Sequence, residues 1–185
     1  MNKLLNTIHA QQQQYKVGFA YLMSSQCQSE ILSLINKIKQ YSRVLILGNG
    51  GSLTVSLHIE EDLLKMADIP ALSMSSTPMM SCLGNDCGFD NIFKIWIDSH
   101  LQRDDLVILI SSSGESQNII NAAKLVGKNN LVTFTGFNPN NRLNKRGCIN
   151  IHVPSSEYGV VETTHMAILH CAIDILAKEK DNGTV

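Results

Sequence analysis

A serine-rich segment, Ser111–Ser116 (SSSGES), is the most prominent polar cluster in the chain. It follows an apolar run and precedes a helical pattern, so several hydroxyls and exposed backbone N–H groups would meet at a strand-to-helix junction. Such a neutral cradle suits a phosphate group. A helix cap would need only one serine, and the carboxylate of Glu115 would oppose phosphate unless it points outward. We predict that this segment binds phosphate.

A glycine-rich segment, Gly48–Ser52 (GNGGS), also follows an apolar run. Glycines let the backbone approach a ligand closely, and Ser52 can cap the helix that follows. A tight corner would explain the glycines as well, and no Lys-Ser/Thr pair follows, as it would in a Walker loop. The segment therefore indicates either a ligand contact or a simple turn.

The helix expected after this loop carries an imidazole and two carboxylates on one face. His58, Glu61 and Asp62 are three and four residues apart, which stacks them along a helix. Groups placed in this way can bind one metal ion or share a proton. A structural histidine beside acidic residues that favour the helix dipole is the alternative.

Another helical pattern, near the end of the chain, is apolar apart from a few polar residues that include Glu162, His165 and His170. Glu162 and His170 are separated by about 12 Å of helix rise. Both could reach one ion only if the helix were irregular or a neighbouring subunit contributed. For His165 we predict a structural role, packed or capping.

The elements that would position these residues alternate along the chain. Apolar runs rich in branched residues predict buried strands at 43–48, 71–74, 106–110, 131–135 and 149–153. Helical patterns lie at 3–40, 52–66, 90–100, 116–127 and 160–179. This alternation predicts an α/β fold with right-handed crossovers and a doubly wound parallel sheet, whose ligands bind at the carboxyl ends of the strands.

The length of 185 residues fits one domain. We predict that residues 1–40 form N-terminal helices and residues 41–185 form the α/β core. A hydrophobic content of 44% with 17% charged residues is typical of a globular protein. The net charge of −1 gives no electrostatic reason to propose nucleic acid as the main ligand.

The sequence also predicts a cytoplasmic location, without membrane contact. No uninterrupted apolar run approaches the roughly 18 residues needed to span a membrane, and the N-terminus does not resemble a signal peptide. The cysteines are odd in number and scattered, which is typical of reduced thiols rather than a disulfide framework. We expect most of the cysteines to be small core residues. The five are Cys27, Cys82, Cys87, Cys148 and Cys171.

Taken together, these segments resemble the phosphoheptose isomerases, the sedoheptulose 7-phosphate isomerases of the SIS (sugar isomerase) fold. The motifs occur in order along nearly the whole chain: GNGGS at 48–52, His58 with acidic residues, GNDCGF at 84–89, SSSGES at 111–116, TG at 135–136 and ETTH…H at 162–170. The resemblance implies a SIS-type, flavodoxin-like sheet and a homotetramer that uses the N-terminal helices. It also implies conversion of a seven-carbon ketose phosphate for bacterial surface-sugar synthesis.

The resemblance further implies roles for individual residues. The implied substrate-binding residues are Asn49, Gly50, Gly51, Ser52, Asn85, Asp86, Ser111, Ser112, Ser113 and Ser116. The implied ligands of a divalent metal, usually zinc in the family, are His58, Asp62, Glu162 and His170. In an aldose–ketose isomerase, Asp62 would be the base and His170 the acid. The sequence leaves open whether Asp62 transfers protons or binds the metal.

The chain departs from the family pattern at several of these places. The family usually has glutamate at position 62 and glutamine at 162, where this chain has Asp62 and Glu162. An aspartate and a basic residue before position 162 are replaced by Gly159 and Val160, and a family arginine aligns near Met66. The shorter Asp62 would move a carboxylate by about 1 Å, and such a shift can cost on the order of a hundredfold in rate.

Two non-catalytic alternatives follow from the same fold. One relative of the isomerases binds the bacterial replication initiator instead of turning over a sugar, and it lacks the last histidine of the pattern. This chain has both His58 and His170, which favours the enzyme. A module that senses a sugar phosphate is the other alternative, although the sequence contains no attached DNA-binding segment.

Overall fold

The computed structural model describes residues 2–183 and contains a sheet of five parallel strands in the order β2-β1-β3-β4-β5. The strands are β1 (Arg43–Gly48), β2 (Ala71–Leu72), β3 (Asp105–Ser111), β4 (Leu131–Thr135) and β5 (Ile149–His152). The α-helices are α1 (Asn2–Leu22), α2 (Ser25–Ile38), α3 (Gly51–Ala67), α4 (Thr77–Cys87), α5 (Ile92–His100), α6 (Gln117–Ala123) and α7 (Tyr158–Asp181). Two 3₁₀ turns, η1 (Phe89–Asn91) and η2 (Lys128–Asn130), complete the order.

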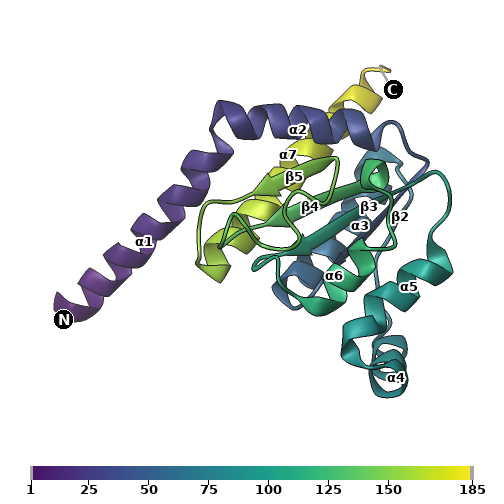
Figure 1. Cartoon of the computed structure of the whole chain (residues 1–185). Coiled ribbons are helices and arrows are strands. Elements are labelled where there is room, and N and C mark those ends of the chain that lie inside the picture. The colour runs from purple at the N-terminus through teal and green to yellow at the C-terminus, as the bar shows by residue number, and fades with distance from the viewer. Residues whose placement is uncertain (1, 184–185) are drawn as a thin grey trace.

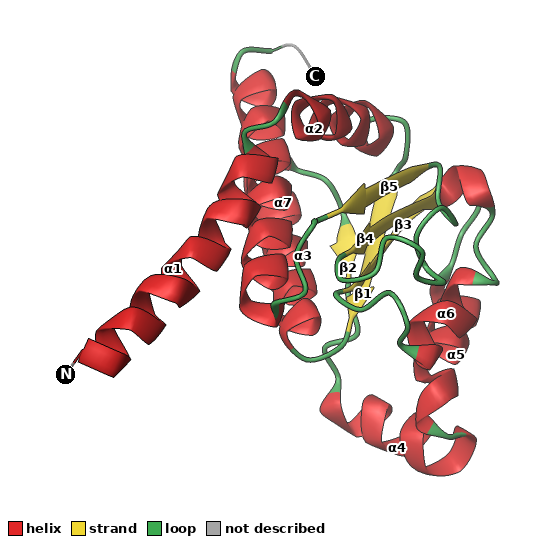
Figure 2. Cartoon of the chain, turned by 60° about the vertical axis from the view of Figure 1, so that its left-hand side comes forward, coloured by secondary structure: helices red, strands yellow, loops and turns green. Residues whose placement is uncertain are grey.

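Helices cover both faces of the sheet (Figures 1 and 2). Successive side chains of a strand point to opposite faces. Val44 and Ile46 of β1 therefore pack with α2, α3 and α7, whereas Leu45 and Leu47 pack with α5 and α6. Because both faces are buried, β1 and β3 contain continuous apolar runs rather than alternating ones, whereas β4 and β5 also carry polar residues such as Thr133 and Asn150.

The strand order reverses between β1 and β3. From β1 the chain passes to β2 on one side, and from β3 it passes to β4 and β5 on the other. The connections at the carboxyl ends of β1 and β3 therefore diverge, and a crevice of this kind is where open α/β sheets bind ligands. β1 ends at Gly48 and β3 at Ser111, so both predicted ligand loops lie at this crevice.

The doubly wound parallel fold predicted from the sequence is confirmed, and each predicted strand is present. The helices differ in detail. The N-terminal helical region is interrupted at Ser24, whose side chain caps α2 by accepting a hydrogen bond from the backbone N–H of Cys27. α4 was not predicted from the sequence, although Ser76 caps it and Pro78 lies in its first turn. α6 is shorter than predicted and ends at Ala123.

The expectation that most cysteines are core residues is wrong. All five are free thiols, but only Cys27 is buried; Cys82, Cys87, Cys148 and Cys171 are exposed. α7 is long and apolar enough to span a membrane by length and composition alone. Its buried residues contribute to the layer that contains α2 and α3, which is the position of a core helix.

His165 on α7 is fully buried, which confirms the predicted structural role. Its Nε2 donates a hydrogen bond to the backbone carbonyl oxygen of Thr135, at 3.0 Å. The ring also makes an edge-to-face contact with Phe134. Since a carbonyl only accepts, the neutral ring carries its proton on Nε2. Burial lowers the pKa of His165 from 6.5 to about 4.

This burial predicts a loss of stability in mild acid. Between pH 6.5 and pH 4 the unfolded chain protonates this histidine and the folded chain does not. The contribution is complete above pH 6.5 and is lost as the pH falls toward 4, up to about 3 kcal/mol. Urea unfolding from pH 7 to 4.5 should show a shallower pH dependence for His165→Gln than for the natural chain. His9→Gln, at an exposed histidine, is the control; equal slopes for all three proteins would contradict the prediction.

Candidate active site

A reciprocal pair of side-chain amides bridges the crevice between β1 and β3. The Asn49 Nδ2 donates to the Asn118 Oδ1 and the Asn118 Nδ2 donates to the Asn49 Oδ1, both at 2.9 Å. Asn118 is buried on α6, and its Oδ1 also accepts from the backbone N–H of Ile119. The pair fixes the glycine-rich loop after β1 against the helix that follows the serine loop.

A cavity of about 220 Å³ lies between these two loops. All the predicted substrate-binding residues except Asn85 and Asp86 line it: Asn49, Gly50, Gly51, Ser52, Ser111, Ser112, Ser113 and Ser116. Ile110, Tyr158 and Glu162 complete the lining. The two segments singled out for their residue types therefore form one site.

The serine hydroxyls offer hydrogen bonds to a ligand in this cavity. Ser111 Oγ donates to Ser116 Oγ at 3.3 Å, and Ser113 Oγ accepts from the backbone N–H of Glu115 at 3.2 Å. Ser112 Oγ is buried and has no hydrogen-bond partner among the described residues. A buried hydroxyl without a partner is costly, so an oxygen-rich ligand would satisfy it.

Glu115, whose charge would oppose a phosphate, does not line the cavity. Its carboxylate is bound by the side chain and backbone of Arg142. The condition set by the sequence, that Glu115 must point outward, is therefore met.

A second polar cluster forms where α3 packs against α7. Asp62 Oδ2 lies 3.3 Å from His58 Nε2 and 3.3 Å from His170 Nδ1. The two imidazole rings meet nearly edge to face, with centroids 5.0 Å apart. Asp62 is mostly buried and the histidines are partly exposed, so the cluster is open to solvent on the imidazole side.

Glu162 lies apart from this cluster, against Gly51. A Cβ at position 51 would come within 2.2 Å of Glu162 Oε2, so only glycine leaves room for the carboxylate. Partial burial raises the pKa of Glu162. A second cavity, of about 480 Å³, reaches from Gly51 and Glu162 to His170. Gly51 and Glu162 line both cavities and thus form their common wall.

The donor set of the cluster fits a divalent metal. One ligand atom from each of His58, Asp62 and His170 lies within 4.8 Å of the other two. Zinc bonds to nitrogen and carboxylate oxygen of about 2.0–2.2 Å would span such a group after small side-chain rotations. The structure therefore brings three of the four predicted ligands together within one chain, and Glu162 is not in the group.

Two predicted substrate-binding residues lie elsewhere. Asn85 and Asp86 are exposed near the end of α4, where the Asn85 Nδ2 donates to the Asp86 Oδ1 at 2.8 Å. Neither lines either cavity at the crevice. Asn118 and Tyr158 were not predicted from the sequence; the signal for Asn118 was its place in a helix directly after the serine loop.

Comparison with known proteins gives this site its context. No family model matches the chain. The phosphoheptose isomerase of Buchnera aphidicola is 31% identical over 160 residues, which are 82% of each chain. That of Sulfurimonas denitrificans is 31% identical over 165 residues, 80% of this chain and 85% of its own.

The solved structure of phosphoheptose isomerase from Neisseria gonorrhoeae has the same fold, with a TM-score of 0.82 and 20% sequence identity. The match covers 94% of this chain and 99% of that one. The likeness in sequence to the curated relatives, over most of both chains, shows the family. The chain belongs to the phosphoheptose isomerases.

Proposed function

We propose that this protein is an aldose–ketose isomerase of phosphorylated sugars, with sedoheptulose 7-phosphate or a related heptose phosphate as substrate. One observation carries the proposal: the serine-lined cavity and the cavity that reaches His170 share the wall formed by Gly51 and Glu162. One sugar phosphate could therefore hold its phosphate among the serines and its reacting carbons near the His58–Asp62–His170 cluster. The names of the relatives agree with this substrate.

The isomerisation moves a proton between C1 and C2 of the sugar through an enediol, and needs a base and an acid. In this proposal Asp62 takes the proton from C1 and returns it to C2. His170 moves a proton between the oxygens on the same two carbons. The 3.3 Å separation of His170 Nδ1 and Asp62 Oδ2 allows the two groups to act on adjacent atoms of one substrate.

Asp62 and His170 could alternatively join His58 as ligands of a divalent metal, zinc by the resemblance, and we keep Glu162 as the fourth candidate ligand. Metal binding and proton transfer compete for the Asp62 carboxylate. A bound divalent ion would polarise the sugar carbonyl and stabilise the charge of the enediolate. Glu162 approaches from the common wall of the two cavities. Its extra negative charge, compared with the usual glutamine, would strengthen the attraction for a cation.

A non-catalytic binding protein is the less favoured alternative. Such a protein has no need for two histidines and a carboxylate within reach of one another, and here all three are present. Turnover of sedoheptulose 7-phosphate by the purified chain is the direct test. A protein that binds the sugar phosphate without turning it over, with and without added zinc, would contradict the proposed activity.

The phosphate proposal makes Ser112 the most informative serine. Ser112→Ala removes a buried hydroxyl that has no partner among the described residues, so the melting temperature should stay equal or rise. The affinity for inorganic phosphate should fall by about tenfold or more, because a hydrogen bond to a charged group contributes about 1.5–3 kcal/mol. Calorimetric titration and thermal unfolding measure the two effects. Ser99→Ala, on an exposed face of α5, is the control; unchanged affinity in Ser112→Ala would refute the cradle.

The clustered ligands and Glu162 are expected to contribute differently to zinc affinity. His170→Ala should lower zinc affinity by more than about tenfold, since even outer-shell partners of a metal contribute this much. Glu162→Ala should retain most of the zinc, because Glu162 lies outside the cluster. Metal analysis after equilibrium dialysis measures both variants. Equal loss of zinc in both would make Glu162 a full ligand, and no loss in His170→Ala would refute the site.

We also propose a cytoplasmic homotetramer whose active site is completed by assembly. Much of α1 extends away from the sheet (Figures 1 and 2). It exposes apolar side chains that a single copy leaves uncovered: Leu4, Leu5, Ile8, Val17 and Phe19. Asn85 and Asp86, which line neither of the two cavities at the crevice, would be available to a neighbouring copy.

Assembly can be tested on α1. Ile8→Asp places a charge on its exposed apolar surface, so it should dissociate the oligomer and lower activity together. Gln11→Asp, on exposed polar surface of the same helix, should change neither. Light scattering beside an activity assay across a dilution series measures both quantities. A monomer with full activity would contradict the shared site.

A further inference from the structure

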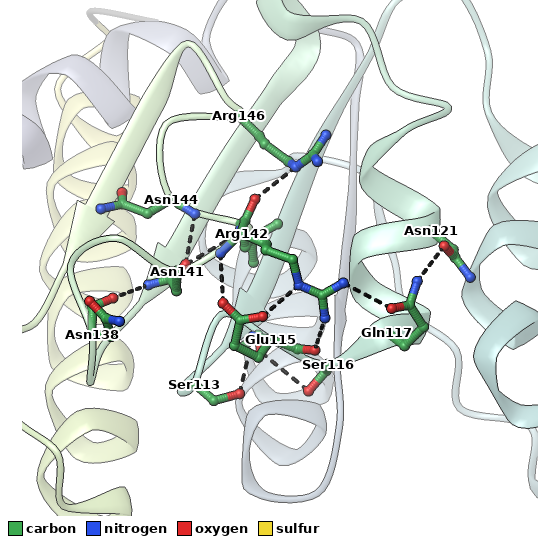
Figure 3. A network of polar contacts seen from close by, with 12 residues as sticks. Ser113, Glu115, Ser116, Gln117, Asn121, Asn138, Asn141, Arg142, Asn144 and Arg146 are labelled. Carbon is green, nitrogen blue, oxygen red and sulfur yellow. Dashed lines mark hydrogen bonds and ion pairs between the residues drawn. The ribbon is translucent and has the colours of Figure 1, made fainter.

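The segment between β4 and β5 makes hydrogen bonds to the serine loop (Figure 3). The backbone N–H of Gly136 donates to the carbonyl oxygen of Ser112, and the N–H of Leu143 donates to that of Gly114. Leu143 is fully buried in the core, which anchors the middle of the segment. The outer segment and the serine loop are therefore one connected unit.

Asn141 fits the two parts together. Its side chain occupies the space beside Gly114, where a Cβ would lie 1.9 Å from the Asn141 Oδ1. Gly114 also has a φ of +65°, a conformation that favours glycine. Asn141 is buried, and its Oδ1 accepts from the backbone N–H groups of Leu143 and Asn144. These contacts set the position of the neighbouring Arg142.

Arg142 makes three hydrogen bonds to Glu115 and a fourth to Gln117 (Figure 3). Its backbone N–H donates to Glu115 Oε1 at 2.8 Å and its Nε to Glu115 Oε2 at 2.5 Å. One terminal nitrogen donates to the carbonyl oxygen of Glu115 at 2.8 Å, and the other to Gln117 Oε1 at 3.0 Å. The guanidinium thus holds the side chain and the backbone of Glu115 and reaches the first residue of α6.

The contacts continue beyond Arg142. The Gln117 Nε2 donates to the Asn121 Oδ1, and the Asn121 Nδ2 donates to the backbone carbonyl oxygen of Asp90. The serine loop is in this way connected through α6 to the 3₁₀ turn that follows α4. The hydrogen bonds from Arg142 also lower the pKa of Glu115, so its carboxylate is charged at neutral pH.

A charged Glu115 would disfavour phosphate binding if its carboxylate turned toward the cavity. It lies between Ser113 and Ser116, which both line the cavity proposed for phosphate. A carboxylate released from Arg142 could turn toward that cavity and repel a doubly charged phosphate. Glu115 and Arg142 are both about half exposed, so their attraction by itself adds little to the stability of the fold. The contact is better explained by what it does to the loop.

We propose that Arg142 is a positioning residue for the substrate phosphate. It neutralises Glu115, holds its carboxylate outside the cavity and fixes the serine loop in the conformation that receives the phosphate. This proposal rests on the proposed function of the serine loop. The effect belongs to binding, because among the described residues no hydrogen bond or ion pair joins Arg142 to the His58–Asp62–His170 cluster, so KM changes and kcat does not.

Three variants of the full chain test the proposal: Arg142→Ala, Glu115→Gln and the double variant. Arg142→Ala should weaken the binding of inorganic phosphate by about tenfold at low salt, and less at high salt, where exposed charges are screened. KM for sedoheptulose 7-phosphate should rise by about the same factor, with kcat within about twofold. The double variant should recover most of the affinity, because Glu115→Gln removes the charge that Arg142 controls.

Arg146→Ala is the matched control. It removes one positive charge from the same segment, while its side chain donates to the backbone carbonyl oxygen of Arg142 and not to Glu115. It should leave phosphate affinity near that of the natural chain. A similar loss in Arg146→Ala would mean that net charge, not the contact with Glu115, matters, and would overturn the proposal.

The double variant distinguishes control of the Glu115 charge from a direct or purely structural role of Arg142. If it binds phosphate as weakly as Arg142→Ala, Arg142 acts on the phosphate directly or only as a structural tie, and the proposal fails. An unchanged affinity in Arg142→Ala, or a natural chain without affinity for phosphate, also overturns it. The proposed isomerase activity fails separately, if the natural chain binds phosphate but converts no sugar.

Discussion

The reversal of strand order between β1 and β3 is the constraint on which the site depends. Because the connections after these two strands diverge, their carboxyl ends face an open crevice instead of a crossing helix. The glycine loop and the serine loop both begin there, and the amide pair of Asn49 and Asn118 fixes the distance between them. The polar cluster lies beside this crevice, since α3 starts at the glycine loop and α7 packs on it.

Patterns that depend on local sequence were predictable. The run 43–48 is apolar from Val44 to Leu47, the residues that meet both covered faces of the sheet, so its burial and parallel pairing could be inferred. The contact between His58 and Asp62 could be predicted from their four-residue spacing on one helix. The serine and glycine loops could be assigned to one edge of the sheet, because parallel strands end on the same side.

Features set by packing between distant segments were not predictable from residue spacing, although the family resemblance did place His170 with Asp62. His170 contacts Asp62 because of the angle and register at which α7 crosses α3. The spacing along α7 showed only that Glu162 and His170 lie too far apart on a regular helix to bind one ion easily. The contact of Arg142 with Glu115 joins residues 27 positions apart through an irregular segment. The exposure of Cys82 and Cys87 follows from α4, a helix without buried residues.

The amide pair also affects how the protein ages. Asn49 is followed by Gly50, and an asparagine before glycine is chemically fragile, because the next backbone nitrogen can attack the side-chain carbonyl and release ammonia. Here both polar ends of the Asn49 side chain are held by Asn118, which restrains the rotation that this attack requires. Deamidation would leave an aspartate or isoaspartate facing the cavity, and its negative charge would exclude the anion that the loop is shaped to receive. The contact between Asn49 and Asn118 would therefore also slow chemical inactivation of the protein.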